Sequence, residues 1–245
     1  MLPAALIALA LRVAPGFLIG ILTLIALPRQ RIDLRIVVYI LLFVLLRDAL
    51  TPLGLWTITP GGSIRLPSDP VMLIDLGLAS FAGVFIINAF EPELAKLLVW
   101  FRGKPGWAVL AGLVGMIVVV APVLLLRHTL IPEVPLPPVP AINLGPLLVL
   151  ALLGNFLEEA LFRGYLQGLL ERSAGPIRAA FASGLCFALF HTFLVTTVTN
   201  VGPLLLAFVW FEGTVAGLVR SRYGVVASTI THGGAIFVLA SGWAG

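Results

Sequence analysis

The sequence predicts an all-α, polytopic membrane protein, and three observations lead to this prediction. Of the 245 residues, 60% are hydrophobic and 11% are charged, and the mean hydropathy is +1.12, whereas soluble domains have roughly 25% charged residues. The apolar residues form runs of about 20, the length of a helix that spans a bilayer. Lys and Arg lie mostly between these runs. A soluble globular protein, a disordered chain and a disulfide scaffold are therefore excluded, the last because Cys186 is the only cysteine.

The apolar runs predict about eight transmembrane helices. In chain order they cover residues 6–27, 36–55, 71–90, 107–126, 145–170, 179–198, 204–219 and 225–240. We expect one integral membrane domain over residues 1–245. Residues 1–144 supply four N-terminal helices, and residues 145–245 form a four-helix core that carries the polar motifs.

The loops between these spans alternate in charge, and this alternation predicts the topology. The odd-numbered loops are basic, with Arg29, Arg31 and Arg35, then Lys96, Arg102 and Lys104, then Arg172 and Arg178, and finally Arg220 and Arg222. The second loop has Arg65 alone, and the proline-rich segment 132–140 and the turn 200–203 have no Lys or Arg. By the positive-inside rule the basic loops face the cytoplasm and both termini lie on the other side.

The positive charge of the chain is therefore explained by its membrane topology. We expect the lipid bilayer as a partner, and we expect no nucleic-acid partner. Lys is scarce beside Arg, while Ala, Gly, Val and Leu are abundant. This usage favours a bacterial inner membrane. The sequence shows no signature of an oligomeric state.

Ionisable residues inside apolar spans are the candidates for function, because each costs several kcal/mol unless it is paired or hydrated. They are Arg12, Arg47, Asp48, Asp75, Glu158, Glu159, Arg163, His191, Glu212 and His232. Arg47 and Asp48 are neighbours and point to different helix faces. We interpret them as structural, with Asp75 as one partner that Arg47 could have.

Two carboxylates lie in the middle of the fifth span, with an arginine one turn later. Glu159 and Arg163 are four residues apart with the acid first, the favoured order for an ion pair on a helix face. Glu158 is left without a local partner, and an unpaired buried carboxylate suits a general base that takes a proton from water. The alternative is a structural network of these three residues with Asn155.

Two histidines lie in later spans, His191 well inside the sixth and His232 in the eighth. Two histidines and a spare glutamate on separate helices are harder to explain by packing than one histidine alone. They predict a catalytic cluster. Gly233 and Gly234 would let another helix or an extended peptide approach His232 closely.

These residues resemble the ordered motifs of the CPBP (CAAX protease and bacteriocin-processing, or Abi) family of intramembrane proteases, which is related to the Ras-converting CAAX prenyl endopeptidase. The motifs are Glu158-Glu159-x-x-x-Arg163, Phe187-x-x-x-His191 and a histidine in the last helix, His232. The resemblance implies an endopeptidase that cuts near the C-terminal region of a membrane-anchored protein or peptide. It implies that Glu158 and His191 activate water, and that His232 helps to bind the oxyanion with an Asn or Asp one turn later.

The sequence departs from the family pattern at that last position. Ile236 stands four residues after His232, where the family usually has Asn or Asp, and loss of one oxyanion donor costs about 100- to 1000-fold in hydrolases. Residues that could substitute are Ser228, Thr229, Thr231, Thr192 and Glu212. We expect Glu212 either to face the cavity or to pair with an arginine such as Arg47.

Two other functions follow from the same residues. Ile236 motivates a non-catalytic membrane-binding or immunity protein on the same fold. A transporter with the buried acids as a proton relay is less favoured, because no inverted repeat is visible in the sequence.

A metal site is a further alternative. Glu158, His191 and His232 with an open water position would suit catalytic zinc, and the family has been described as metalloproteases on that ground. The sequence has no HExxH pair. If His232 binds the oxyanion, only Glu158 and His191 remain beside the water, so we favour a glutamate-type mechanism without metal.

Overall fold

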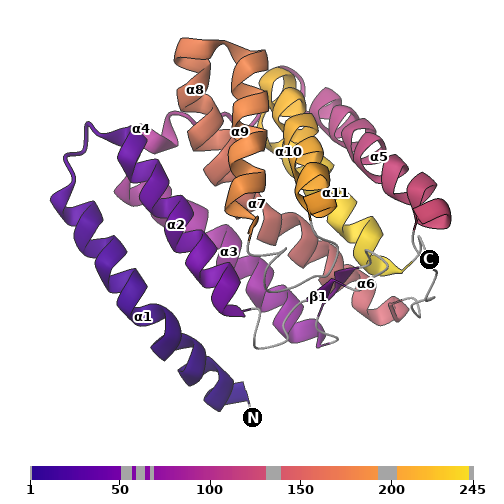
Figure 1. The fold of residues 1–245 in the computed structure, drawn as a ribbon, viewed down its shortest axis with the longest axis horizontal. Coiled ribbons are helices and arrows are strands. Elements are labelled where there is room, and N and C mark those ends of the chain that lie inside the picture. Colours follow the sequence, from indigo (N-terminus) through magenta and orange to yellow (C-terminus); the bar gives the residue numbers. More distant parts are fainter. Residues whose placement is uncertain are drawn as a thin grey trace.

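The structure is a computed structural model, and it describes residues 2–50, 57–58, 64–66, 69–130, 139–192 and 203–242. Helices make up most of this part of the chain (Figure 1). The N-terminal elements are α1 (Leu2–Ala26), α2 (Ile32–Leu50), β1 (Thr57–Ile58), β2 (Ile64–Arg65), α3 (Pro70–Phe90), α4 (Pro92–Ala95) and α5 (Pro105–Leu130). The two short strands pair antiparallel, with Thr57 opposite Arg65.

The C-terminal elements begin with one long helical rod. The rod consists of α6 (Ala141–Val149), the π-helical segment η2 (Leu150–Gly154), α7 (Asn155–Glu159), the π-helical segment η3 (Ala160–Leu166) and α8 (Gln167–Ala174). Three helices follow it, α9 (Pro176–Phe190), α10 (Pro203–Tyr223) and α11 (Val225–Ser241). The two glutamates of α7 are therefore flanked by π turns, which are rare and frequently mark functional sites.

A helix lies within each predicted span, which confirms the all-α fold class. Within the described residues, five helical segments are long and apolar enough to cross a membrane: Ile7–Ala26, Pro70–Phe90, Pro105–Leu126, Ala141–Ala174 and Pro203–Tyr223. α9 and α11 are shorter apolar helices. Residues 51–55 of the second predicted span and 193–198 of the sixth lie outside the described residues.

Many large apolar side chains on the outer helices face outward. Leu11 on α1 and Leu125 on α5 are 72% and 74% exposed. In water such a surface would be costly, whereas it suits contact with lipid tails. The chain is an all-α polytopic integral membrane protein.

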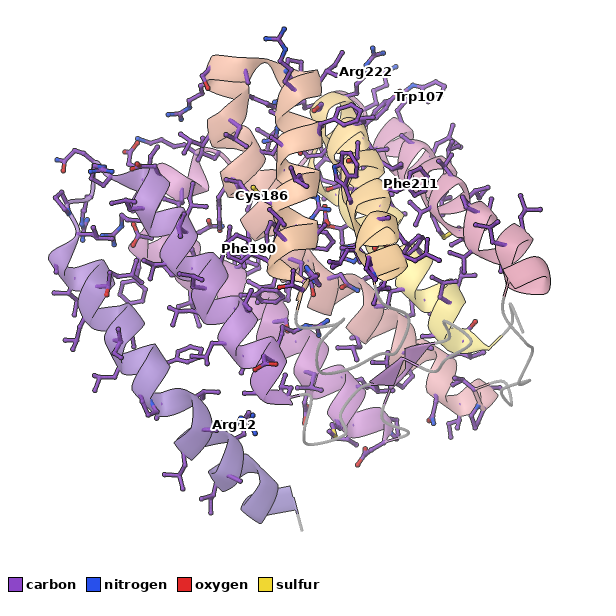
Figure 2. The ribbon with its side chains drawn as sticks, in the orientation of Figure 1. Arg12, Trp107, Cys186, Phe190, Phe211 and Arg222 are labelled. Carbon is purple, nitrogen blue, oxygen red and sulfur yellow. The ribbon has the colours of Figure 1, made fainter. Side chains whose placement is uncertain are left out.

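The turns that carry the predicted basic loops gather at one end of the bundle. Figure 1 shows the turns α1–α2, α8–α9 and α10–α11 together at the upper end. Arg222 and Trp107 mark this end in Figure 2, and Arg12 lies toward the other end. Gly224 is required in the α10–α11 turn, because its φ is +93° and a Cβ would stand 2.5 Å from the carbonyl oxygen of Trp100. We call the end of the bundle that carries these turns the basic end.

Small residues let the C-terminal helices pack closely around the rod. Added Cβ atoms would lie 2.8 Å from the Thr214 backbone nitrogen at Gly184, 3.1 Å from Ala180 Cβ at Gly217 and 2.3 Å from the Ala151 carbonyl oxygen at Gly233. The first two glycines join α9 to α10, and the third brings α11 against η2. The predicted close approach of another helix beside His232 is confirmed.

Candidate active site

A cavity of about 120 Å³ lies between α2, α7, α9, α10 and α11 at the level of the two glutamates. This volume has room for several water molecules. Its polar lining consists of Arg47, Asn155, Glu158, His191, Glu212 and His232. The rest of the wall is apolar and includes Ile236. A few convergent polar groups in an apolar wall are typical of a binding site.

Glu158 is buried, and its two carboxylate oxygens have different neighbours. Oε1 lies 3.3 Å from Nη2 of Arg47, and Oε2 lies 3.6 Å from Nε2 of His191. The prediction of an unpaired Glu158 is wrong, because α2 carries Arg47 across to α7. The ion pair of Arg47 within the described residues is with this carboxylate, and not with Asp75 or Glu212 as the sequence had left open.

His191 lies at the C-terminal end of α9, directly after Phe190, which Figure 2 labels. The prediction that it sits well inside its helix is wrong, because the helix ends at Phe190 although the apolar run continues. Its Nδ1 is 2.7 Å from the carbonyl oxygen of Phe187. A carbonyl oxygen can only accept a hydrogen bond, so Nδ1 carries the hydrogen and Nε2 of the neutral ring is an acceptor.

The second glutamate joins two other motif residues in a buried cluster. Oε1 of Glu159 lies 3.2 Å from Nη1 of Arg163 and 3.0 Å from Nδ1 of His232. The predicted ion pair with Arg163 is confirmed, and His232 is an additional partner that helical spacing did not indicate. All three side chains are almost completely buried.

Phe187 connects this cluster to the cavity. The guanidinium carbon of Arg163 lies 4.1 Å from the centre of the Phe187 ring, within the range of a cation–π contact. The same ring lies 4.2 Å from the His191 ring and 5.4 Å from the His232 ring, between ring centres. Gly213 makes room here, because a Cβ would stand 2.8 Å from Nη2 of Arg163.

Glu212 and Asn155 complete the polar wall. Glu212 faces the cavity and is only 3% exposed, so the cavity-facing alternative is the correct one. Asn155 donates from Nδ2 to the carbonyl oxygen of Ala151, at 2.7 Å. Ile236 lines the same cavity, one turn after His232.

Arg47 is the member of this site that sequence reasoning placed outside it. The signal was present, since an arginine inside an apolar span needs a partner. What the sequence lacked was the pairing of α2 with α7, because residues so far apart in the chain share no spacing rule. Asp48, its neighbour, does not line the cavity.

The residues fit a zinc ion only in part. Nδ1 of each histidine is hydrogen-bonded to an oxygen atom. Nε2 would therefore be the metal-binding atom of each ring, and metal-ligating histidines usually have this arrangement. However, Glu158 already pairs with the cation Arg47. Among the described residues, no three or more His, Cys, Asp or Glu side chains stand together closely enough to hold a metal ion.

Comparison with known proteins gives a family match over the C-terminal part of the chain. Residues 140–238 match the family model described as type II CAAX prenyl endopeptidase Rce1-like. The searches of curated proteins and of solved structures gave no match. The matched region contains Glu158, Glu159, Arg163, His191 and His232. The resemblance to the CPBP family is thereby confirmed: residues 140–238 are similar to the Rce1-like family of CAAX-type proteases.

Proposed function

We propose that this chain is an intramembrane endopeptidase that hydrolyses a peptide bond near the C-terminal region of a membrane-associated protein or peptide. The observation that carries the proposal is the pair of hydrogen-bond acceptors, Glu158 Oε2 and His191 Nε2, that lie 3.6 Å apart on the cavity wall. A water molecule beside them can donate one O–H group to each. The family match supports the reaction class.

In the first step the water attacks the carbonyl carbon of the substrate while Glu158 takes its proton. A C–O bond forms, and the electron pair of the C=O double bond moves to the oxygen. In the second step the C–N bond breaks, the double bond re-forms, and the proton passes from Glu158 to the leaving amine. Arg47 holds the other carboxylate oxygen, which keeps Oε2 turned to the water.

In this scheme His232 stabilises the oxyanion. Its Nδ1 is held by Glu159, which fixes the ring while the ring lines the cavity. With the Glu159 carboxylate as its counter-charge, a ring protonated on both nitrogens can donate from Nε2 to the oxyanion. Arg163 and Phe187 hold this pair in place. No step in this mechanism needs a metal ion.

We also propose that substrate enters from the side opposite the basic end. α2, α9 and α10 each have one terminus at the basic end, and their cavity residues Arg47, His191 and Leu205 lie near the other terminus. Since basic loops favour the cytoplasm, the cavity is reached from the extracytoplasmic side. This orientation puts both termini outside, and it favours an exported segment over a cytoplasmic one as substrate.

Thiol labelling in intact cells tests the orientation. In a Cys186→Ala background, we expect a membrane-impermeant maleimide to label Leu205→Cys and to leave Arg222→Cys unlabelled until the membrane is permeabilised. Labelling of the Arg222→Cys variant alone would reverse the orientation and leave the catalytic proposal intact.

Quantitative profiling of new protein termini tests the function itself. Membranes from cells that express wild type, Glu158→Gln or neither are compared, at equal protein amounts. Glu93→Gln is a matched control, because Glu93 is exposed and its ion pair within the described residues is with the surface residue Lys96. We expect the same new protein termini with wild type and with Glu93→Gln. These termini should be absent with Glu158→Gln and without expression.

The alternative is a membrane-binding or immunity protein on the same fold, and Ile236 favours it. Identical termini in wild type and Glu158→Gln, with both variants restoring the cellular phenotype, would establish this alternative and reject the protease.

A further inference from the structure

Position 236 leaves the proposed protease without one oxyanion donor, and the structure shows which side chains can replace it. Of the five candidate substitutes, all within the described residues, only Glu212 lines the cavity. The hydroxyls of Ser228 and Thr229 both donate to the carbonyl oxygen of Val225, at 2.9 Å. Thr231 donates to the carbonyl oxygen of Ala227 at 3.1 Å. These hydroxyls are used within α11 itself.

Glu212 is a buried carboxyl group without a hydrogen-bonding partner for one of its oxygens. The side chain is 3% exposed, and Oε1 has no hydrogen-bond partner within the part of the chain that the structure describes. The same part of the chain contains no cation within 4 Å of it. By contrast, each of the other two cavity-region carboxylates has an arginine, Arg47 for Glu158 and Arg163 for Glu159.

Burial without a contacting counter-ion favours a neutral Glu212. The charged and titratable groups that act on it are His232 on α11, Arg163 on η3 and the two glutamates of α7. Arg163 and His232 both contact Glu159 and not Glu212. A charged Glu212 would therefore lie in a low-dielectric interior without a contacting counter-ion, which is costly, so the group is expected to carry its proton. A protonated carboxyl is a hydrogen-bond donor.

We propose that Glu212, as a neutral carboxylic acid, is the second oxyanion donor of this enzyme and takes the place of the Asn or Asp absent at position 236. α10 and α11 lie side by side (Figure 1), and Glu212, His232 and Ile236 line one cavity. The O–H group of Glu212 donates to the substrate oxygen as the C=O electron pair moves onto it, and the proton stays on Glu212. This role rests on the proteolytic function proposed above.

The test compares two replacements of Glu212 on one substrate, an internally quenched peptide made from the strongest cleavage site of the terminus profiling. Glu212→Gln keeps a donor of the same shape, and we expect kcat to stay within about tenfold of wild type. Glu212→Met removes the donor, and we expect kcat to fall by about 100- to 1000-fold with little change in KM. Adding Ile236→Asn to Glu212→Met should recover at least about tenfold, because it restores a donor on α11.

The pH profile gives a second readout that does not depend on the methionine variant folding. Wild-type activity should fall more steeply at high pH than that of Glu212→Gln, because both Glu212 and His232 can lose a proton in wild type, whereas the amide of Glu212→Gln does not titrate. A Glu212→Met variant as active as wild type, or a Glu212→Gln variant as inactive as Glu212→Met, would overturn the donor role. If wild type and Glu158→Gln cleave the peptide equally, the failure lies with the proposed function and not with Glu212.

Discussion

Replacing each of the two adjacent glutamates by glutamine should separate catalysis from stability. Glu159 is fully buried and touches two partners, Arg163 at 3.2 Å and His232 at 3.0 Å. Removing its charge leaves Arg163 buried without a counter-ion, which costs about 3 kcal/mol or more. At roughly 2 to 4 °C per kcal/mol for a chain of this size, Tm should fall by about 6 to 12 °C.

Glu158→Gln should behave differently. Its ion-pair partner Arg47 is 34% exposed, so the guanidinium can be hydrated when the charge is lost. We expect a loss of stability below about 1 kcal/mol. Peptide cleavage should nevertheless disappear, because an amide cannot take the proton of water.

Thermal unfolding of both variants in detergent, followed by tryptophan fluorescence, measures the first quantity, and cleavage of the quenched peptide measures the second. Equal Tm shifts for the two variants would refute the assignment of Glu159 to the buried cluster and Glu158 to the water. A cleaving Glu158→Gln variant would refute the general-base role.

Three further outcomes follow from the site. Gly213→Ala should lower Tm and activity together, because its Cβ would stand 2.8 Å from Arg163 Nη2, whereas Gly83→Ala, which meets nothing within 4 Å, should be neutral or stabilising in the same unfolding assay. Treatment with the chelator 1,10-phenanthroline should leave peptide cleavage unchanged in the metal-independent mechanism, and activity that is lost and then restored by zinc would contradict it. Ile236→Asn alone should raise kcat by less than about tenfold, since Glu212 already supplies a donor. A gain near 100-fold in the kinetic assay would mean that the second donor is absent in wild type.

The sequence predicted the helices well because hydropathy is a local property. Residues 71–90 and 204–219 were predicted as spans, and the helices there run from Pro70 to Phe90 and from Pro203 to Tyr223. The end of α9 was missed, since its apolar run continues beyond Phe190 and no proline or charge marks the stop. Hydropathy reports burial in lipid and does not report where the backbone leaves a helix.

Within the site, the part that depends on spacing was predictable and the part that depends on packing was not. The Glu159–Arg163 pair follows from a separation of four residues on one helix. The contact of Glu158 with Arg47 requires α2 to lie against α7, and the contact of Glu159 with His232 requires α11 to lie there too. Such pairings are set by which helix faces meet, and an apolar face of one span is much like that of another.

The two π segments have a consequence for the length of the catalytic rod. Each π turn holds more residues than an α turn. η2 and η3 therefore change the direction in which the side chains point from one α-helical stretch of the rod to the next, and the three stretches face different neighbours. Beyond η3, Gln167 donates from Nε2 to the carbonyl oxygen of Gly217 on α10, at 2.9 Å. Deleting a single residue from 160–166 would let this segment close as an α turn and keep Gln167 directed at α10. Deleting one residue from the α-helical stretch 155–159 would instead rotate everything downstream by about 100° and would turn Gln167 away from α10. Single-residue deletions in η3 should therefore be better tolerated than single-residue deletions in α7.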